Sequence, residues 1–413
     1  MLKIAAVSIV ALFSVSGCKP NGQEKSEGKA ASGKPAETQK AQAPPSLLIA
    51  QAQFLRNGSE FKPGPAKLTI LRPKAETQTE ILEDPDSNVF HKALEWQGGI
   101  LTIGGEKALL KHWTKNNGKW TATKLWEKNW GGKFNRLRDI EIGDVTGDKK
   151  PNLVIATHDQ GVIAIGSLSG KEWKFEELFQ NPDTFVHEIE LGDLDGDGAL
   201  EIYATPSARN RSDGTSQAGK VLAIKREGKQ WATQTVVSWN NSHAKEILVA
   251  DIDKNGTDEL YVVREGHVEK STDGLKLKDP VTITRYLKKS GEFHPQEIAT
   301  LEDRQARFAL ASDLNHDGVV DLAVSGMNSG LHLLQPDKDG AYSIETIDTE
   351  SGGFEHAIIA ADLDQNGKAE LYVAADREKQ IRRYLWNGSS FSRKNLLEIP
   401  TDHITWNLQM GRL

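Results

Sequence analysis

Five copies of one acidic loop recur along this chain, and no other feature constrains its fold as strongly. Oxygen-bearing side chains stand at loop positions 1, 3, 5 and 9, and four of the copies have glycine at position 6. Ca²⁺ takes about six to eight oxygen ligands, and the glycine allows the sharp turn that folds the carboxylates around the ion. The pattern therefore predicts calcium loops. The predicted ligands are Asp144 and Asp148; Asp193, Asp195, Asp197 and Glu201; Asp251, Asp253, Asn255 and Glu259; Asp313, Asn315, Asp317 and Asp321; and Asp362, Asp364, Asn366 and Glu370.

The residues around the loops indicate strands rather than the helices of an EF-hand. Each loop lies between two short apolar runs, such as 189–191 and 202–204 in the second copy. The alternative interpretation is a set of acidic β-turns that bind no metal, because Asp-Gly turns are common in β-rich proteins. The first copy has Thr146, Lys149 and Asn152 at positions 3, 6 and 9, so we expect it to bind weakly or not at all. The second copy carries the most carboxylates and is expected to bind most tightly.

The start of the chain has the features of an export signal, which we assign to residues 1–17. Lys3 precedes an apolar run that begins at Ile4 and is too short to span a bilayer. Residues 15–18 read Val-Ser-Gly-Cys, which resembles the lipobox of bacterial lipoproteins, and Cys18 is the only cysteine. The resemblance implies cleavage before Cys18 and lipidation of its thiol. Lys19, in place of aspartate, favours the outer membrane.

Residues 18–46 are predicted to form a flexible tether, because 19–46 contain no large apolar residue that could bury surface. Random-coil scaling gives this segment a reach of about 30 Å. Residues 47–413 then form the folded part. The net charge of −7, without a basic domain or tail, argues against nucleic acid as a partner. We expect a monomer whose only membrane contact is the lipid anchor.

The loops recur at spacings of 49, 58, 62 and 49 residues, the range of β-propeller blades. After each loop come an apolar run, a third run, a glycine turn and an aromatic residue that opens a fourth run, as in Ser169-Gly-Lys-Glu-Trp173. Four strands per unit in an all-β chain predict a β-propeller. Residues 91–126 add one unit without the acidic loop. Residues 403–408 resemble a first strand and 66–84 two last strands, so together they complete one blade. The prediction is seven blades, with six or eight as alternatives, and residues 47–65 are a candidate for the missing second strand.

These loops and strands resemble the FG-GAP/VCBS repeat proteins, a family that includes the integrin α-subunit propeller. The resemblance covers most of residues 91–413, although the Phe-Gly and Gly-Ala-Pro strings are absent from this sequence. It implies Ca²⁺ in the loops that join strands one and two, on the lower face of the disc. It does not imply an enzyme activity, because the family includes adhesins, lectin-like binders and a few polysaccharide lyases.

A basic residue stands six positions before each acidic loop. Because a strand rises about 3.3 Å per residue, these residues are expected about 20 Å from the loops, around the upper mouth of the central channel. The strand pattern adds Lys92 and His403 in the two atypical blades. Such a ring could bind an anion, or the residues could be solvated strand ends that pair with Asp139, Glu188 and Glu246. The five candidate ligand-binding residues are Arg138, His187, Lys245, Arg307 and His356.

The sequence favours a non-catalytic, calcium-stabilised propeller that is tethered to the outer membrane and binds a protein or glycan on its upper face. Longer loops at 206–220 and 264–280 are expected to overhang that face, where binding usually resides. One alternative is a lyase or hydrolase that acts on an acidic polysaccharide at the channel mouth. Another is a scaffold subunit of an envelope complex.

Overall fold

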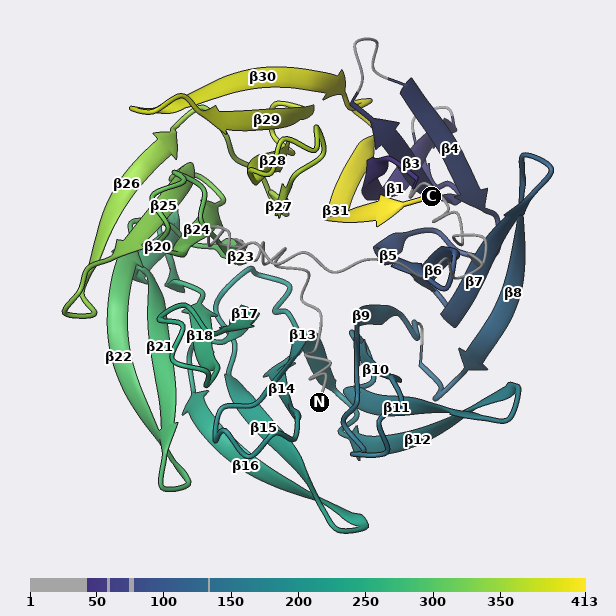
Figure 1. The fold of residues 1–413 in the computed structure, drawn as a ribbon, viewed down its shortest axis with the longest axis horizontal. Coiled ribbons are helices and arrows are strands. Elements are labelled where there is room, and N and C mark those ends of the chain that lie inside the picture. The colour runs from purple at the N-terminus through teal and green to yellow at the C-terminus, as the bar shows by residue number, and fades with distance from the viewer. Residues whose placement is uncertain (1–42, 58–59, 74–77, 133) are drawn as a thin grey trace, which may run out of the picture.

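The computed structural model describes residues 43–57, 60–73, 78–132 and 134–413. The predicted export signal, Cys18 and most of the predicted tether lie outside the described residues. Every regular element among these residues is a β-strand. Seven sheets of four or five strands are arranged around a central axis, and one further sheet is a two-stranded hairpin (Figure 1). The predictions of an all-β fold and of seven blades are confirmed.

We number the blades in chain order. In each blade the first strand is innermost, and neighbouring strands are antiparallel. Blade 1 comprises β5 (Phe90–Trp96), β6 (Gly99–Gly104), β7 (Ala108–Asn116) and β8 (Lys119–Lys128); blade 2 comprises β9 (Leu137–Gly143), β10 (Asn152–Thr157), β11 (Val162–Ser169) and β12 (Glu172–Gln180); blade 3 comprises β13 (Thr184–Gly192), β14 (Glu201–Ala208), β15 (Gly219–Glu227) and β16 (Gln230–Trp239). Blade 4 comprises β17 (Ala244–Ala250), β18 (Glu259–Arg264), β21 (Val281–Lys289) and β22 (Glu292–Leu301); blade 5 comprises β23 (Ala306–Ser312), β24 (Asp321–Gly326), β25 (Leu331–Pro336) and β26 (Tyr342–Asp348); blade 6 comprises β27 (Ile358–Ala361), β28 (Glu370–Ala375), β29 (Gln380–Trp386) and β30 (Phe391–Glu398).

Blade 7 is shared between the two ends of the folded chain, as the sequence predicts. Its strands are β31 (His403–Arg412), β1 (Pro45–Asn57), β3 (Ala66–Arg72) and β4 (Gln78–Asp84), and the short β2 (Glu60–Pro63) pairs with the far end of β1. The second strand of this blade is therefore β1. It pairs with β31 from Pro45↔Arg412 to Gln53↔His403 and closes the ring.

The core lies between the blades. Seven clusters of buried apolar side chains are described, and each one joins two neighbouring blades. Between blades 4 and 5, for example, Val263 and Ile283 meet Leu322 and Val324. Second strands such as β10 are buried at every position because both of their faces pack against neighbouring blades.

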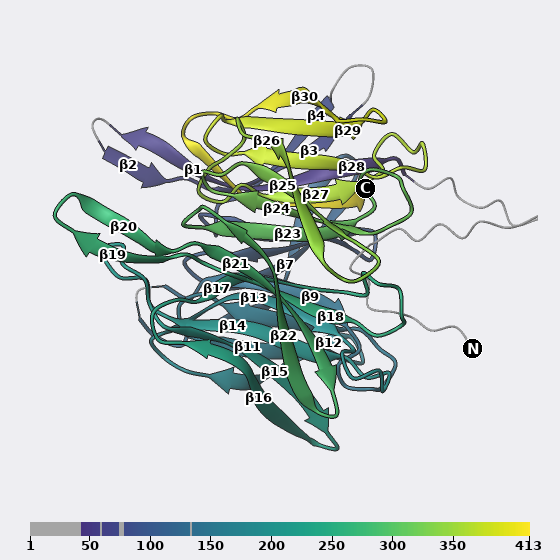
Figure 2. The same ribbon diagram turned by 90° about the vertical axis from the view of Figure 1, so that its left-hand side faces the viewer.

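The two faces of the disc differ. The acidic loops connect the first and second strands of blades 2 to 6, so they share one face, which we call the lower face. The hairpin of β19 (His267–Ser271) and β20 (Gly274–Asp279) follows the second strand of blade 4 and therefore projects from the opposite, upper face. Figure 2 shows this hairpin and the β1–β2 tip on the same side of the disc.

Candidate functional site

The acidic loops share one backbone geometry. In loops two to five the carboxylate at position 1 accepts hydrogen bonds from the amides at positions 5 and 6, as Asp193 does from Asp197 and Gly198 at 3.0 and 2.8 Å. At position 9 the side chain accepts one from the amide at position 2, as Glu259 does from Ile252 at 2.9 Å. Asp313 and Asp362 repeat the first arrangement. The loops are thus organised by their own backbone amides before any ion is considered.

The turn of each loop needs positive φ at two positions, of which the sequence indicated one. The glycine at position 6 has φ between 86° and 92° in loops two to five, and Lys149 takes its place at 65° in loop one. Position 4 also has positive φ, and in loops three to five this position holds Lys254, His316 and Gln365 at 57° to 63°. Lys, His and Gln adopt positive φ only at an energetic cost, so their presence at position 4 did not indicate this backbone conformation.

Cationic side chains from outer strands lie among the loop carboxylates, which the sequence did not indicate. The Lys225 ammonium lies 2.7 Å from Asp195, 2.7 Å from Asp197 and 3.1 Å from Glu201. Lys288, from the next blade, adds a contact to Asp195 at 3.2 Å. Burial raises the pKa of Asp195, but the hydrogen bonds from the two lysines outweigh it and bring that pKa to about 2.

Loops three and five receive an arginine at matching positions of the third strand. Arg285 pairs with Asp253 at 2.7 Å and with Glu259, and Arg383 pairs with Glu370 at 3.2 Å. Burial nonetheless raises the pKa of Glu259 and of Glu370 to about 7. Loop four differs, because the corresponding third-strand residue, facing Ala323, is Leu333.

The carboxylates converge in two loops. Asp193, Asp195 and Asp197 offer oxygen atoms within 4.8 Å of one another, and so do Asp251, Asp253 and Glu259. In loop four, Asp321 keeps one buried oxygen without a hydrogen-bond partner, and burial raises its pKa to about 6. Loop one is the least acidic, and its Asn152 side chain instead bonds the Val145 amide and Ser167.

A tyrosine two residues after position 9 supports three of the loops. Tyr203, Tyr261 and Tyr372 are buried and donate hydrogen bonds to Glu201, Glu259 and Glu370 of their own strands. The signal in the sequence is Glu-Ile/Leu-Tyr, which recurs after loops two, three and five. Sequence reasoning missed these tyrosines because their apolar bodies resemble ordinary core residues.

The five basic candidates lie at the start of the innermost strands, where the strand pairing is irregular. The register shifts at Arg138, His187, Lys245 and Arg307, so each of these is an extra residue in its strand. His356 precedes β27 and has φ of 52°. A β-bulge re-aims one side chain, and here it recurs at one level of the ring. We call these positions the bulge ring.

The bulge ring corrects two assignments in the atypical blades. In blade 1 the extra residue is His91, between paired Phe90 and Lys92, and not Lys92 as expected. In blade 7 it is Trp406, between paired Thr405 and Asn407, and not His403. The errors arose because the strand pattern in these blades has no acidic loop to set the count.

At neutral pH the charge of the bulge ring comes from three residues. Arg138 and Arg307 both contact Glu355, which is 0 % exposed, while Lys245 and Arg307 lie 3.6 and 3.5 Å from Glu265. The pairs with Asp139, Glu188 and Glu246 that formed the alternative expectation are not the contacts observed for these three cations.

The histidines of the bulge ring are neutral. Burial lowers the pKa of His187 well below its usual value and that of His356 to about 4. His187 bonds Ser207 at 3.0 Å, and His356 donates from Nδ1 to the Gly326 carbonyl at 2.7 Å. Their roles in this structure are therefore hydrogen bonds within the mouth of the channel.

Below the bulge ring the channel carries a layer of carboxylates, which we call the acidic layer. Its members come from the innermost strands of blades 2 to 4, with Lys92 of blade 1 bonded to two of them at 2.8 and 2.5 Å. Asp139 and Glu246 also accept hydrogen bonds from the edge amides of Ile189 and Ala309 in following blades, each at 3.0 Å. The members are Asp139, Glu141, Glu188, Glu190 and Glu246.

Comparison with known proteins agrees with this geometry. The model of the FG-GAP-like repeat matches residues 313–373, which run from loop four through loop five to β28. The other loops repeat its pattern and occupy the same place in their blades. The chain is a propeller of FG-GAP-like repeats. A search of curated proteins finds no match to the sequence.

Solved structures resemble the FG-GAP propeller in fold alone. A putative 6-phosphogluconolactonase from Bacteroides uniformis has 12 % identity and a TM-score of 0.55 over 90 % of this chain and 100 % of its own. A putative 6-phosphogluconolactonase from Bacteroides fragilis has 12 % identity and a TM-score of 0.54 over 92 % of this chain and 100 % of its own. The periplasmic gluconolactonase PpgL of Pseudomonas aeruginosa has 12 % identity and a TM-score of 0.51 over 89 % of this chain and 98 % of its own.

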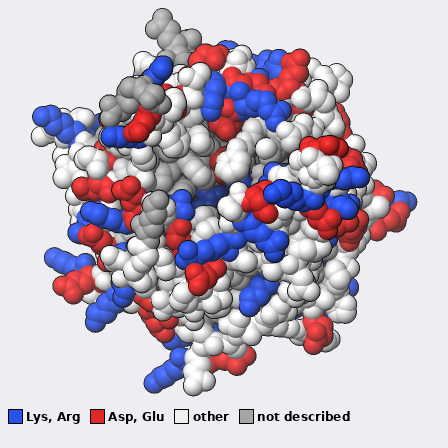
Figure 3. Space-filling view, turned by 180° about the vertical axis from the view of Figure 1, so that it is seen from behind, with Lys and Arg blue, Asp and Glu red and all other residues white. Residues whose placement is uncertain are grey.

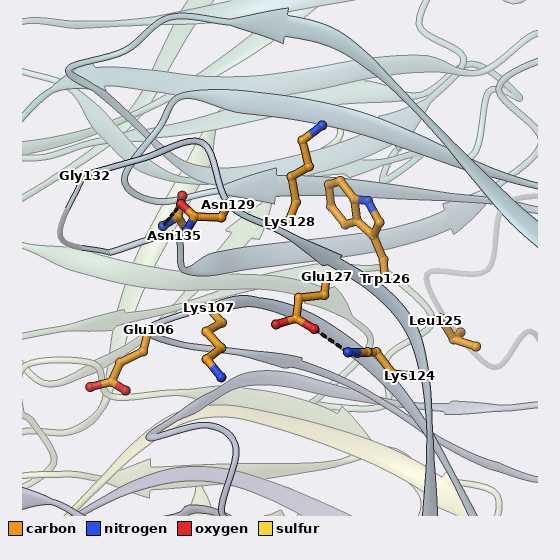
Figure 4. A pocket seen from close by; sticks show the side chains of 10 residues that line it. All are labelled: Glu106, Lys107, Lys124, Leu125, Trp126, Glu127, Lys128, Asn129, Gly132 and Asn135. Carbon is orange, nitrogen blue, oxygen red and sulfur yellow. Dashed lines mark hydrogen bonds and ion pairs between the residues drawn. The ribbon is translucent and has the colours of Figure 1, made fainter.

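Two concavities mark the surface of the FG-GAP propeller. The larger, about 700 Å³, is a groove on the outermost strand of blade 1. Figure 4 shows that its walls carry both charges, with Lys124 bonded to Glu127 and Lys107 near Glu106. The smaller, about 190 Å³, lies on the upper face and includes Lys245 and Arg307. Figure 3 shows Lys and Arg side chains gathered around the central hollow of this face. Two members of the bulge ring, Lys245 and Arg307, therefore line the smaller pocket.

No helix among the described residues is long and apolar enough to cross a membrane.

Proposed function

We propose that this protein is a non-catalytic binding module, held in the cell envelope by a lipid on Cys18, which binds a protein or glycan at its upper face. The observation that carries the proposal is the bulge ring. In three blades the innermost strand adds one residue and places Arg138, Lys245 or Arg307 at the mouth of the channel. Bulges of this kind are common beside binding sites, because they re-aim a side chain from a rigid scaffold.

A binding screen tests this proposal. We expect the purified chain to bind a defined set of glycans or envelope proteins, and we expect Lys245→Met to weaken that binding at least tenfold. Lys229→Met, which removes an exposed lysine from the β15–β16 hairpin, is the matched control and should bind normally. A ligand that binds both variants as it binds the unchanged chain would place the binding site elsewhere.

The acidic loops are proposed to bind Ca²⁺ and to stabilise the lower face. Loops two and three bring carboxylate oxygens together in the manner a hard cation needs, and the unpartnered oxygen of Asp321 fits a ligand in loop four. In loop two the ammonium groups of Lys225 and Lys288 compete for the same oxygens. Charge count alone therefore overstates the affinity of that loop.

Lys225→Met is expected to raise the calcium affinity of loop two by about tenfold or more. Two charges of +1 and +2 that are 4 Å apart repel by about 2 kcal/mol even at the dielectric constant of water. Calorimetric titration of calcium into the two proteins measures the change. Lys229→Met should leave the affinity unchanged, and an unchanged affinity in Lys225→Met would show that the lysine does not oppose the ion.

A lyase or hydrolase acting on an acidic glycan is the second candidate, and Lys245 favours it. Burial lowers its pKa to about 8, so part of the population is uncharged near neutral pH and can accept a proton. Incubation with uronate polymers, followed by assay of new reducing ends and unsaturated products, distinguishes the two functions. Turnover that Lys245→Arg abolishes would establish the enzyme.

A further inference from the structure

The smaller pocket lies between the channel mouth and two loops of the upper face. Its walls come from the segment after β14, from the start of the β19–β20 hairpin and from the residues that precede β23 and β27. The loops that the sequence placed over this face at 206–220 and 264–280 thus form two of its sides. Its volume of about 190 Å³ corresponds to about six water molecules at ~30 Å³ each, the room that one monosaccharide unit takes.

The charges on the pocket wall favour an anion. Four cations line it, namely Arg211, Lys245, Arg304 and Arg307, against one carboxylate, Glu265. Burial raises the pKa of Glu265, but Lys245, His243 and Arg307 outweigh it and bring the pKa to about 2. Glu265 is therefore ionised, and Glu355 pairs with Arg307 from outside the wall, so two carboxylates oppose four cations and the wall stays positive.

Three buried polar atoms on this wall form no hydrogen bond within the protein, although two of them, on Glu265 and Arg307, lie 3.5 Å apart as an ion pair. They are Nδ1 of His243, Oε1 of Glu265 and Nε of Arg307, on side chains that are 3 %, 5 % and 7 % exposed. A buried polar atom without a hydrogen bond is costly, so such atoms usually meet water or a ligand. Three of them on one small pocket indicate a ligand with several hydrogen-bonding groups.

The remaining wall suits a hydroxylated ring. Amide side chains of Asn210, Gln217 and Gln305 and the hydroxyl of Thr215 line the pocket beside the cations. Phe354 is 45 % exposed, and the Arg307 guanidinium lies 3.9 Å from the centre of its ring. An exposed aromatic ring held by a guanidinium offers its other face to a flat or ring-shaped group.

We propose that this pocket binds a sugar acid, one hexuronate unit, with its carboxylate on the cations and its ring against Phe354. The inference rests on the proposed function, because it names the ligand of the same upper face. A free hexuronate and the terminal unit of an acidic polysaccharide share this chemistry. The carboxylate supplies the charge that the wall lacks, and the hydroxyls meet the amide groups.

Calorimetric titration of the full chain with D-galacturonate, its uncharged methyl ester and an oligogalacturonide tests the proposal. For a ligand of this size we expect a Kd of about 1 mM for the acid. We expect binding of the methyl ester to be at least tenfold weaker. Tighter binding of the oligogalacturonide would assign the site to a polymer end, and equal binding would assign it to the free acid.

Two variants with matched controls locate the site. Phe354→Ala and Arg211→Ala should each weaken galacturonate binding about tenfold. Phe61→Ala, at a position 64 % exposed on β2, and Arg209→Ala, two residues before Arg211, should not. Unchanged melting temperatures confirm that the variants fold. Equal binding of acid and ester, or equal binding by Phe354→Ala and Phe61→Ala, overturns the proposal.

The result also separates this inference from the proposed function. A chain that ignores uronates but binds another glycan or a protein in a manner sensitive to Lys245→Met contradicts the sugar-acid site and retains the binding module. A chain that binds no ligand at the upper face contradicts both.

Discussion

Deletion of residues 403–413, which include β31, is expected to abolish cooperative folding of the protein. β31 is the innermost strand of the closing blade, and its pairing with β1 runs from Gln53↔His403 to Pro45↔Arg412, with one interruption at the Trp406 bulge. At about 1 kcal/mol net per hydrogen bond, this pairing alone is comparable with the 5–15 kcal/mol that stabilises a typical domain. The deletion also removes Leu408 from the cluster between blades 6 and 7.

Thermal denaturation followed by circular dichroism measures the effect. We expect the truncated chain to show no sharp transition and to elute as aggregate, because the freed edge of β1 is an unpaired strand edge. A synthetic peptide of residues 403–413, added in excess, should restore the transition. Replacing the β19–β20 hairpin, which pairs only with itself, by a short glycine linker is the control and should retain cooperative unfolding. A sharp transition in the truncated chain would show that closure by β31 is dispensable.

The sequence predicted the parts of the fold that depend on patterns of neighbouring residues. Loop, strand and glycine turn lie within one repeat, so the blades could be counted without any long-range information. Closure was predicted because residues 403–408 had no partner nearby and 66–84 lacked their inner strands. The second strand of this blade, β1, was only a candidate, since nothing in the local pattern of residues 47–65 shows which blade they join.

The parts that could not be predicted depend on contacts between distant residues. Lys225 and Lys288 meet loop two from two different blades, so loop charge alone misjudged that site. Glu265 and Glu355, which hold the cations of the bulge ring, stand outside the repeated positions. The bulges themselves leave no mark in the sequence, and for that reason Lys92 and His403 were placed where His91 and Trp406 lie.

Lys92→Met is expected to lower the free energy of unfolding by about 3–5 kcal/mol at neutral pH, the usual cost of removing one partner from a buried ion pair. Lys92 is buried and donates to Asp139 and Glu141 of the acidic layer. Burial lowers its pKa, but the surrounding carboxylates outweigh this and hold the pKa well above its usual value. Among the described residues, Lys92 is the one cation that forms an ion pair with any of these five carboxyl groups, so its loss leaves all five without an ion pair.

The loss should shrink as the pH falls. Burial and the neighbouring carboxylates already raise the pKa values of Glu188, Glu190 and Glu246 well above the usual value. An acid whose pKa is raised by folding binds its proton more tightly in the folded state, so its contribution to stability is present at low pH and is lost as the pH rises through the folded pKa. Removal of Lys92 raises these pKa values further. Urea denaturation of both proteins at pH 5 and pH 8 measures the difference.

Two controls separate the acidic layer from a general effect of losing a lysine. Lys124→Met breaks an exposed pair with Glu127 and should cost at most about 1 kcal/mol at either pH. Adding Glu141→Gln to Lys92→Met removes one of the unpaired charges and should recover part of the loss at pH 8 but little at pH 5. A Lys92→Met variant that is equally destabilised at both pH values would mean that packing of the lysine stem, and not carboxylate repulsion, determines its contribution. The channel would then be held together by side-chain packing, with its carboxylates neutral throughout.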